Sequence, residues 1–187
     1  MGCSLSTVSK SQIAQKNGIP VKSDCSDITE RQKVLIKKTW NVVSNDMPGV
    51  GAKIFLRIFT IKPAIKQIFP FHDVTGDALL RDGQFRGHAS RFMQAVGAAV
   101  DNINALDSAM APLLFGLGQQ HINYKGFNVE YFSVFSIAIT HVLERELRTK
   151  FTPEVAIAWA KMMEFMVSKL IEGYHDAVKK TSHASFE

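Results

Sequence analysis

The sequence predicts an all-α fold, and three observations support that prediction. Through most of the 187 residues, apolar side chains recur three and four positions apart, which is the period of an amphipathic helix. No stretch alternates apolar and polar residues over any length, as a half-buried strand does. The chain is 46% hydrophobic and contains thirteen Phe, which is enough for a substantial core and too apolar for a disordered protein. We therefore expect one helical domain with terminal extensions.

Composition also argues against several classes of protein. The apolar runs are all short, so we expect no membrane-spanning segment. The net charge of +5 is a mild basic excess without a block of Lys and Arg among aromatic residues, so we expect no nucleic-acid partner. The two cysteines, Cys3 and Cys25, both lie in the polar N-terminal part and do not form a disulfide scaffold. This cysteine usage indicates a reducing compartment.

Residues 1–26 are polar, rich in Ser and Lys, and without helical period, so they are predicted to form a flexible tail. The tail begins Met1-Gly2-Cys3-Ser4-Leu5-Ser6, which fits the pattern for myristoylation of Gly2 after removal of the first residue. One acyl chain holds a protein on a membrane only weakly, and a palmitoyl group on Cys3 would supply the second. Two chains would anchor the protein at the cytoplasmic face of the cell membrane, in its inner leaflet. The alternative is a chance match and a protein free in the cytoplasm, because Gly and Ser are common residues.

The first helix is predicted to begin after Thr29, because Thr29 and Gln32 match a capping box. Met47-Pro48-Gly49 is interpreted as a break after this helix. A second helix follows and stops before Pro63, since the residue preceding a proline is driven out of the helical region. Each helix carries an apolar stripe: Leu35, Ile36, Trp40 and Val43 in the first, and Val50, Ile54, Phe55, Ile58 and Phe59 in the second.

The middle of the chain mixes short elements with two longer helices. Residues 64–69 are predicted to form a short helical turn, followed by the aromatic corner Phe69-Pro70-Phe71-His72. Residues 73–83 are polar and predicted to be a loop. Residues 104–109 connect the next two helices, and the second of these ends near Gly126, a helix C-cap residue.

Two further helices complete the predicted domain. One of them places Phe132, Phe135, Ile139, Val142 and Leu143 on one face. Thr152-Pro153-Glu154 predicts the start of the other, with a Thr N-cap, proline at the first helical position and an acid near the positive helix end. Its apolar residues are Ala156, Trp159, Met163, Val167, Leu170 and Tyr174. Residues 179–187 are expected to be frayed, which leaves residues 27–178 as the folded domain.

Two histidines, His88 and His121, fall on the apolar faces of the two middle helices. Phe92 lies one turn from His88, and Leu117 lies one turn from His121. A single histidine on an apolar face is more often a hydrogen-bonded core residue than a ligand. Two imidazoles that face one apolar space from two helices can, however, hold a flat metal cofactor between them.

With these features in order, the chain resembles the globin family. Trp40 lies in the first helix, Pro63 follows the second, and Phe69 comes six residues later, as in globins. His88 and His121 match the distal and proximal histidines of that family. The resemblance covers most of the chain and implies a three-over-three helical sandwich that binds haem b.

Two further features narrow the resemblance. The segment from Phe151-Thr152-Pro153 to Trp159 is similar to the opening of the final helix in neuroglobin. The N-terminal Met1-Gly2-Cys3, joined to a globin domain, is similar to the acylated, membrane-associated globin X group. This resemblance implies an iron bound by both His121 and His88 in the resting state. The alternative is a five-coordinate iron on which His88 only donates a hydrogen bond to a ligand.

The resemblance also implies roles for neighbouring side chains. The carbonyl of Leu117 is the expected acceptor for the second ring nitrogen of His121. Phe69 is expected to pack on the haem face, and Phe92 with Phe55 to make the distal side crowded and apolar. The remaining expected neighbours are Phe127, Phe132 and Phe135 at the buried edge, and Arg91, Lys125 and His72 near the propionates.

Three hypotheses for function follow from the sequence. The first is a haem protein that binds O2, NO and CO reversibly at a membrane surface and has a redox, sensing or protective role. The second is a haem enzyme that acts on nitrite or NO with a separate reductase, because the chain contains no G-x-G-x-x-G nucleotide-binding pattern. The third is a helical interaction module without haem, against which Phe69, His88 and His121 argue.

Overall fold

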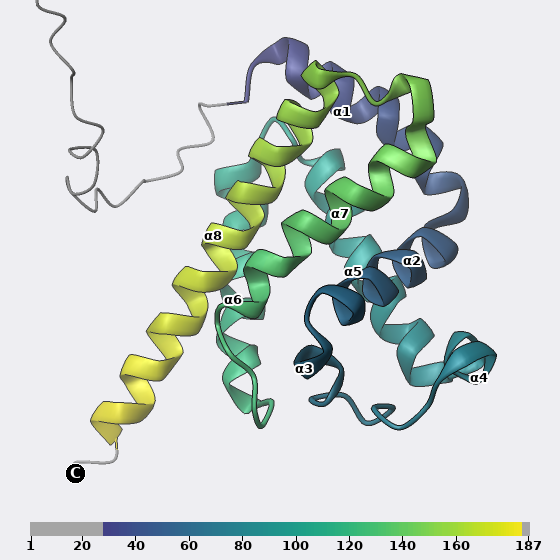
Figure 1. The fold of residues 1–187 in the computed structure, drawn as a ribbon. Coiled ribbons are helices and arrows are strands. Elements are labelled where there is room, and N and C mark those ends of the chain that lie inside the picture. Colours follow the sequence, from purple (N-terminus) through teal and green to yellow (C-terminus); the bar gives the residue numbers. More distant parts are fainter. Residues whose placement is uncertain (1–27, 185–187) are drawn as a thin grey trace, which may run out of the picture.

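Eight α-helices make up most of residues 28–184, the part of the chain that this computed structural model describes (Figure 1). They are α1 Glu30–Val43, α2 Met47–Ile61, α3 Pro63–Lys66, α4 Gly76–Arg81, α5 Gly83–Asp101, α6 Ala111–Gln120, α7 Tyr131–Leu147 and α8 Pro153–Ala184. No strand is present in these residues, so the predicted all-α class is confirmed.

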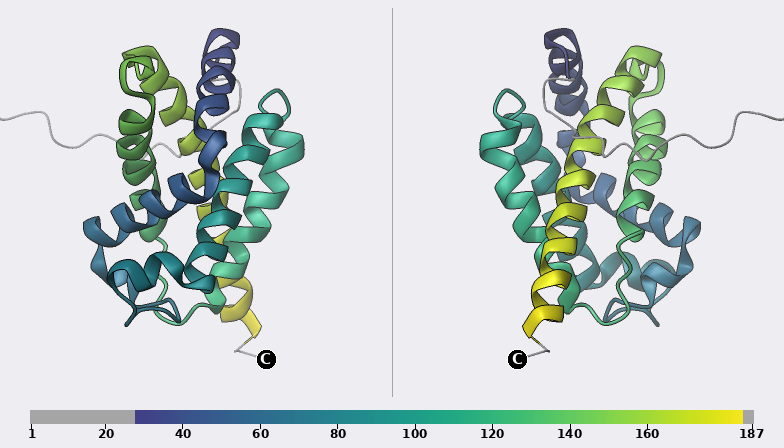
Figure 2. Two further views of the ribbon diagram at one scale, coloured as in Figure 1. Left: turned by 90° about the vertical axis from the view of Figure 1, so that its right-hand side faces the viewer. Right: turned by 90° about the vertical axis from the view of Figure 1, so that its left-hand side faces the viewer.

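The helices pack in two layers. Helices α1, α5 and α6 form one layer and α2, α7 and α8 the other, with contacts between layers at α2–α5, α6–α8 and α1–α8. The right-hand view of Figure 2 shows the long α8 in front, and α8 packs against α6. This arrangement is the predicted three-over-three sandwich. Within the described residues, no helix has both the length and the apolar character needed to cross a membrane.

Helix starts follow the local sequence closely. At α1 the Gln32 amide donates to Thr29 Oγ1 at 3.3 Å, and the Thr29 amide donates to Gln32 Oε1 at 3.0 Å. The predicted capping box is therefore confirmed. At α2 the predicted break at Met47-Pro48-Gly49 is wrong, because Asp46 caps the helix and these residues form its first turn. Proline is tolerated in the first turn of a helix, because an N–H at that position would have no acceptor within the helix.

Other boundaries also differ from the sequence prediction. The helix expected to end near Gly126 ends at Gln120, and a 3₁₀ turn at His121–Asn123 follows it. Residues 73–83 are not all loop, because α4 forms around the buried Leu79. The predicted connection 104–109 contains a π-helical turn at Leu106–Met110 that leads into α6. Residues 179–184, which were expected to be frayed, continue α8, and an i, i+4 ion pair at 2.7 Å joins Asp176 to Lys180.

The core between the layers contains two tryptophans. The rings of Trp40 and Trp159 lie 6.3 Å apart, and both side chains are buried. Trp159 Nε1 donates to Thr39 Oγ1 at 2.9 Å, and this hydroxyl in turn donates to the Leu35 carbonyl at 2.7 Å. The indole N–H and the threonine hydroxyl therefore both have hydrogen-bond partners. These two hydrogen bonds hold α8 against α1.

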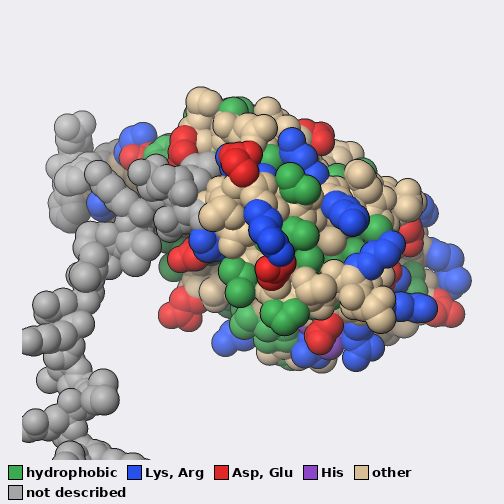
Figure 3. Space-filling model, turned by 90° about the horizontal axis from the view of Figure 1, so that it is seen from above, with side chains coloured by type: hydrophobic (Ala, Val, Ile, Leu, Met, Phe, Trp, Pro, Cys, Tyr) green, Lys and Arg blue, Asp and Glu red, His purple; other side chains and the backbone are tan. Residues whose placement is uncertain are grey.

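The predicted tail and its candidate acylation sites, Gly2 and Cys3, lie outside the described residues. On the face of the domain seen from above, Lys and Arg side chains lie among acidic and uncharged side chains (Figure 3). The expectation that the protein has no nucleic-acid partner stays a prediction.

Two glycines allow α6 and α8 to cross at close range. A Cβ atom on Gly118 would lie 2.0 Å from the Leu170 carbonyl oxygen, and one on Gly173 would lie 1.9 Å from the Phe115 carbonyl oxygen. Both obstacles are backbone atoms, which cannot rotate away as a side chain can. Because His121 follows the last residue of α6 directly, the close packing of α6 against α8 determines the position of His121.

Substitution of Gly118 by Ala is therefore expected to destabilise the domain by about 1–3 kcal/mol, the range for forced overpacking. Gly116→Ala is the matched control, because it changes the same helix and a Cβ there meets nothing within 4 Å. The measurement is the free energy of unfolding from chemical denaturation. Equal stability of the two variants would contradict the close crossing.

Candidate functional site

His121 follows α6 directly, in the 3₁₀ turn His121–Asn123. Its Nδ1 lies 2.6 Å from the Leu117 carbonyl oxygen, so the hydrogen bond predicted from the sequence is present. A carbonyl can only accept, and Nδ1 must therefore carry the proton. The lone pair of this imidazole is then on Nε2, where a metal can bind it. The rings of Phe127 and Phe132 lie 4.8 and 4.9 Å from the imidazole and restrict its orientation.

His88 lies near the start of α5 and is held by aromatic rings. The Phe55 and Phe69 rings lie 4.9 and 4.8 Å from its imidazole, both edge-on. Phe55 reaches it because Gly51, one turn earlier in α2, allows close approach to α5. A Cβ there would lie 2.8 Å from the Ala89 carbonyl oxygen. The ring position of His88 is thus set by the packing of α2 against α5.

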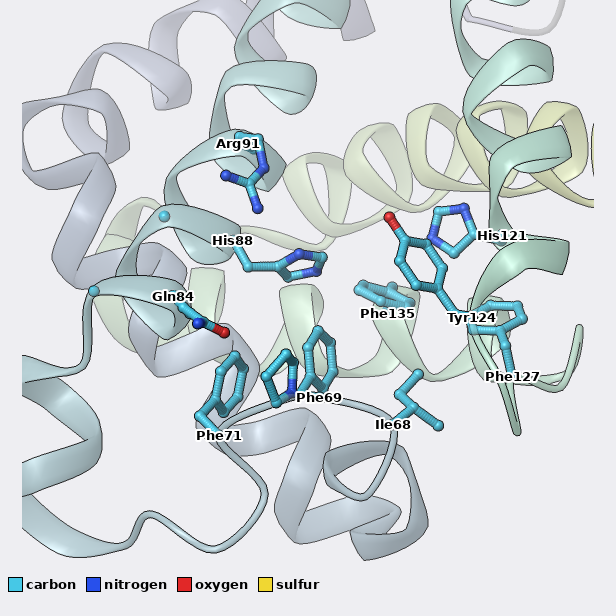
Figure 4. A pocket seen from close by; sticks show the side chains of 13 residues that line it. Ile68, Phe69, Phe71, Gln84, His88, Arg91, His121, Tyr124, Phe127 and Phe135 are labelled. Carbon is cyan, nitrogen blue, oxygen red and sulfur yellow. The ribbon is translucent and has the colours of Figure 1, made fainter.

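The two histidines enter a common space from opposite sides (Figure 4). Both line two adjoining cavities, an outer one of about 530 Å³ and an inner one of about 240 Å³. Sites for small molecules and cofactors usually measure about 300–1,000 Å³. Most other side chains that line the outer cavity are aromatic or apolar, among them Ile68, Phe69, Phe71, Phe127 and Phe135. The inner cavity is lined mainly by apolar side chains, among them Phe92, Leu114, Leu117, Phe132, Met163, Met166, Val167 and Leu170.

Electrostatics keep both imidazoles neutral. Burial, together with the positive charges of Arg91 and of protonated His121, lowers the pKa of His88 to about 4. Burial also lowers the pKa of His121, although its hydrogen bond to Leu117 acts in the opposite direction. At neutral pH each ring therefore keeps a lone pair, which is the form that binds a metal.

The structure brings together nearly all the site residues predicted from the sequence. Phe69, His88, Arg91, Phe92, Leu117, His121, Phe127, Phe132 and Phe135 all line one or both cavities. Lys125 is exposed and is not among the lining residues, and its expected contact with a propionate stays a prediction. His72 also lies outside the lining, with its Nδ1 2.8 Å from Asp73 Oδ1.

Three polar residues of the site were missed by the sequence prediction, and one of them, Gln120, lines the inner cavity. Gln84 and Tyr124 both line the outer cavity (Figure 4). Gln84 precedes His88 by four positions, so helical spacing alone would have placed it on the same face. Tyr124 lies two positions before Gly126, in the segment predicted to be a helix end, and its ring lies 5.5 Å from that of His121.

Comparison with known proteins identifies the family. A family model described as Globin matches residues 52–170, more than half of the chain. The chain belongs to the globin family. It is 30% identical to Cytoglobin-2 of Danio rerio over 161 residues, which cover 84% of this chain and 89% of that protein. It is 26% identical to Neuroglobin of the same fish over 149 residues, which cover 79% of this chain and 92% of that protein.

A solved structure also supports the globin fold of this chain. A hexacoordinated heme protein from an anhydrobiotic tardigrade, crystallised at pH 4, superimposes with a TM-score of 0.75 and 25% identity. The match covers 80% of this chain and 96% of the tardigrade chain.

The residues of this globin fit a haem group. His88 and His121 present neutral nitrogen donors from opposite sides of an apolar space, and Arg91 lines both cavities as a cation. This donor set is one that haem iron accepts as axial ligands. Family membership and the donor set together support a haem-binding role.

Proposed function

We propose that this globin binds haem b between His121 and His88 and reversibly binds O2 and other small gases, including NO and CO. The observation that supports this most directly is the pair of neutral imidazoles facing one apolar cavity. His121 is the proposed proximal ligand, because its Nδ1–H donates to Leu117 and leaves Nε2 for the iron. Haem iron would supply the site for diatomic gases and for one-electron redox changes.

We further propose that His88 binds the iron in the resting state. Its ring is neutral, is held by Phe55 and Phe69, and lines both cavities. An external ligand would then have to displace His88, which suits a redox, sensing or protective role better than bulk oxygen transport. The tardigrade relative, whose title describes it as hexacoordinated, supports the same proposal.

Other side chains of the site would prepare the pocket for the cofactor. Arg91 would pair with a propionate, because a guanidinium matches a carboxylate with two parallel hydrogen bonds. Phe69 would pack on the porphyrin face. Phe92 and Phe135 would exclude water from the space beside His88, since their rings lie 5.5 Å apart along it.

The cofactor and the gas binding can be tested on the purified protein. Extraction into alkaline pyridine should give the haemochrome spectrum of haem b. Addition of CO to the reduced protein should shift the Soret band, and a light pulse should reverse the shift. A reduced protein whose spectrum does not change at saturating CO would contradict the proposed gas binding, even if haem is present.

We also propose that acylation of Gly2 and Cys3 attaches this globin to a membrane. Replacement of Gly2 by Ala removes the myristoylation site and is expected to move the protein into the soluble fraction of expressing cells. Cys3→Ser should leave only transient attachment, because each buried CH₂ contributes about 0.8 kcal/mol and one chain is marginal.

Fractionation of cells expressing the wild type and each variant tests this proposal, with an absorption spectrum as the control for folding. Both variants should keep the wild-type spectrum, because the haem cavity is lined by residues of the helical domain. Sedimentation of Gly2→Ala equal to that of the wild type would show that attachment does not depend on the N-terminal pattern.

A further inference from the structure

A third hollow, of about 480 Å³, lies between α2 and α7, which pack side by side (Figure 1). None of its lining residues lines either histidine cavity. Phe55 of α2 faces His88, and Arg57, which lines the hollow, comes two positions later. Two positions correspond to about 200° around a helix, so the hollow lies on the other side of α2 from the haem site. We call it the α2–α7 groove.

The charged side chains of the groove leave a positive excess. Lys53 Nζ lies 2.7 Å from Glu146 Oε1, so the single carboxylate among the lining residues is already neutralised. Arg57 and Arg145 also line the groove. Within residues 28–184, neither arginine forms an ion pair with an acidic side chain. Two guanidinium charges, one from each helix, therefore remain uncompensated.

Arg57 provides a second and independent observation. Its Nε atom is buried and has no hydrogen-bond partner among the described residues. Buried N–H groups are almost always paired, because an unpaired one loses its bonds to water without replacement. Arg57 is also one of the residues that line the groove, so an acceptor for this N–H can come from outside the described chain.

The neighbouring groups limit what that acceptor can be. His141 lines the groove and has a ring N–H that can donate a further hydrogen bond. The Thr60 hydroxyl already donates to the Leu56 carbonyl at 2.9 Å. The free groups are thus planar guanidinium donors from two helices and one imidazole N–H, and all of them favour an anion with several oxygens. Guanidinium groups match phosphate geometry with paired hydrogen bonds.

We propose that the α2–α7 groove binds a phosphate group through Arg57 and Arg145, with His141 as a third donor. A soluble phosphate compound and a lipid headgroup present the same oxygens, and the test below distinguishes these two sources. The proposal goes beyond the haem-binding role and does not depend on it, because the two sites share no lining residue.

The test uses the full-length, haem-loaded protein prepared without acyl chains. One arm measures binding of inorganic phosphate by NMR titration at constant ionic strength. The other measures sedimentation with phosphatidylcholine vesicles that contain or lack phosphatidic acid, whose headgroup is a phosphate monoester. Arg145→Gln changes an exposed side chain, and Arg86→Gln on α5 is the matched control, because Arg86 is exposed and lies outside the groove.

The Arg145→Gln substitution is expected to weaken binding by about tenfold or more, as loss of a charged hydrogen bond does, and Arg86→Gln is expected to have no effect. Arg145→Lys should restore only part of the affinity, because an ammonium keeps the charge and loses the paired geometry. If these variants change the binding of inorganic phosphate in this way, the ligand is a soluble phosphate compound. If they change only the binding to phosphatidic acid vesicles, the ligand is a lipid headgroup. Equal effects of Arg145→Gln and Arg86→Gln, or no binding in either arm, would overturn the proposal.

Discussion

Replacement of His121 by Ala is expected to reduce haem retention by at least about tenfold, because it removes the nitrogen donor that both coordination models require. The loss should be seen as a weak or absent Soret band in protein purified without added haem. His121→Gly should regain the band when free imidazole is supplied, since the emptied space matches the lost ring.

His72→Ala is the control for this prediction. It removes an imidazole that lies outside both cavities and should leave the Soret band unchanged. A full-strength, unshifted band in His121→Ala would show that His121 is not the proximal ligand.

Replacement of His88 by Leu is expected to change the spectrum without loss of haem. The iron should convert from low spin to high spin, because no second nitrogen is left to bind it. Association of CO with the reduced protein should accelerate by about tenfold or more. In the variant the sixth coordination position is always open, whereas in the wild type His88 must first dissociate from the iron. Rapid mixing of the reduced protein with CO measures this rate.

The same two measurements can also show that His88 does not bind the iron. If wild type and His88→Leu have the same spin state and bind CO at the same rate, His88 is not an iron ligand. A change in the dissociation rate of oxygen alone would instead indicate that His88 only donates a hydrogen bond to bound ligand.

The sequence predicted those features that depend on local spacing. The capping box of Thr29 and Gln32 and the stop before Pro63 follow from backbone chemistry within a few residues, and both are observed. The placement of His88 and His121 on apolar faces likewise follows from helical period. That the two faces meet at one cavity was an expectation that needed the family resemblance as well.

Features that depend on distant parts of the chain were not predicted. The close crossing of α6 and α8 needs Gly118 to meet the backbone at Leu170, and nothing in the sequence near either residue shows this. The α2–α7 groove similarly requires Arg57 and Arg145 to meet across two helices. Helix α4 was missed because it is only six residues long and Leu79 is its one buried residue, so no helical period is visible in the sequence.

The visible absorption spectrum of the reduced, ligand-free wild-type protein tests the central claim most directly, because it reports haem and its coordination together. Iron bound by both His121 and His88 predicts a strong Soret band and two sharp, well-separated visible bands of a low-spin ferrous haem. A single broad visible band would show a five-coordinate, high-spin iron and contradict axial binding by His88. A spectrum without a Soret band, after reconstitution with haem, would contradict haem binding itself.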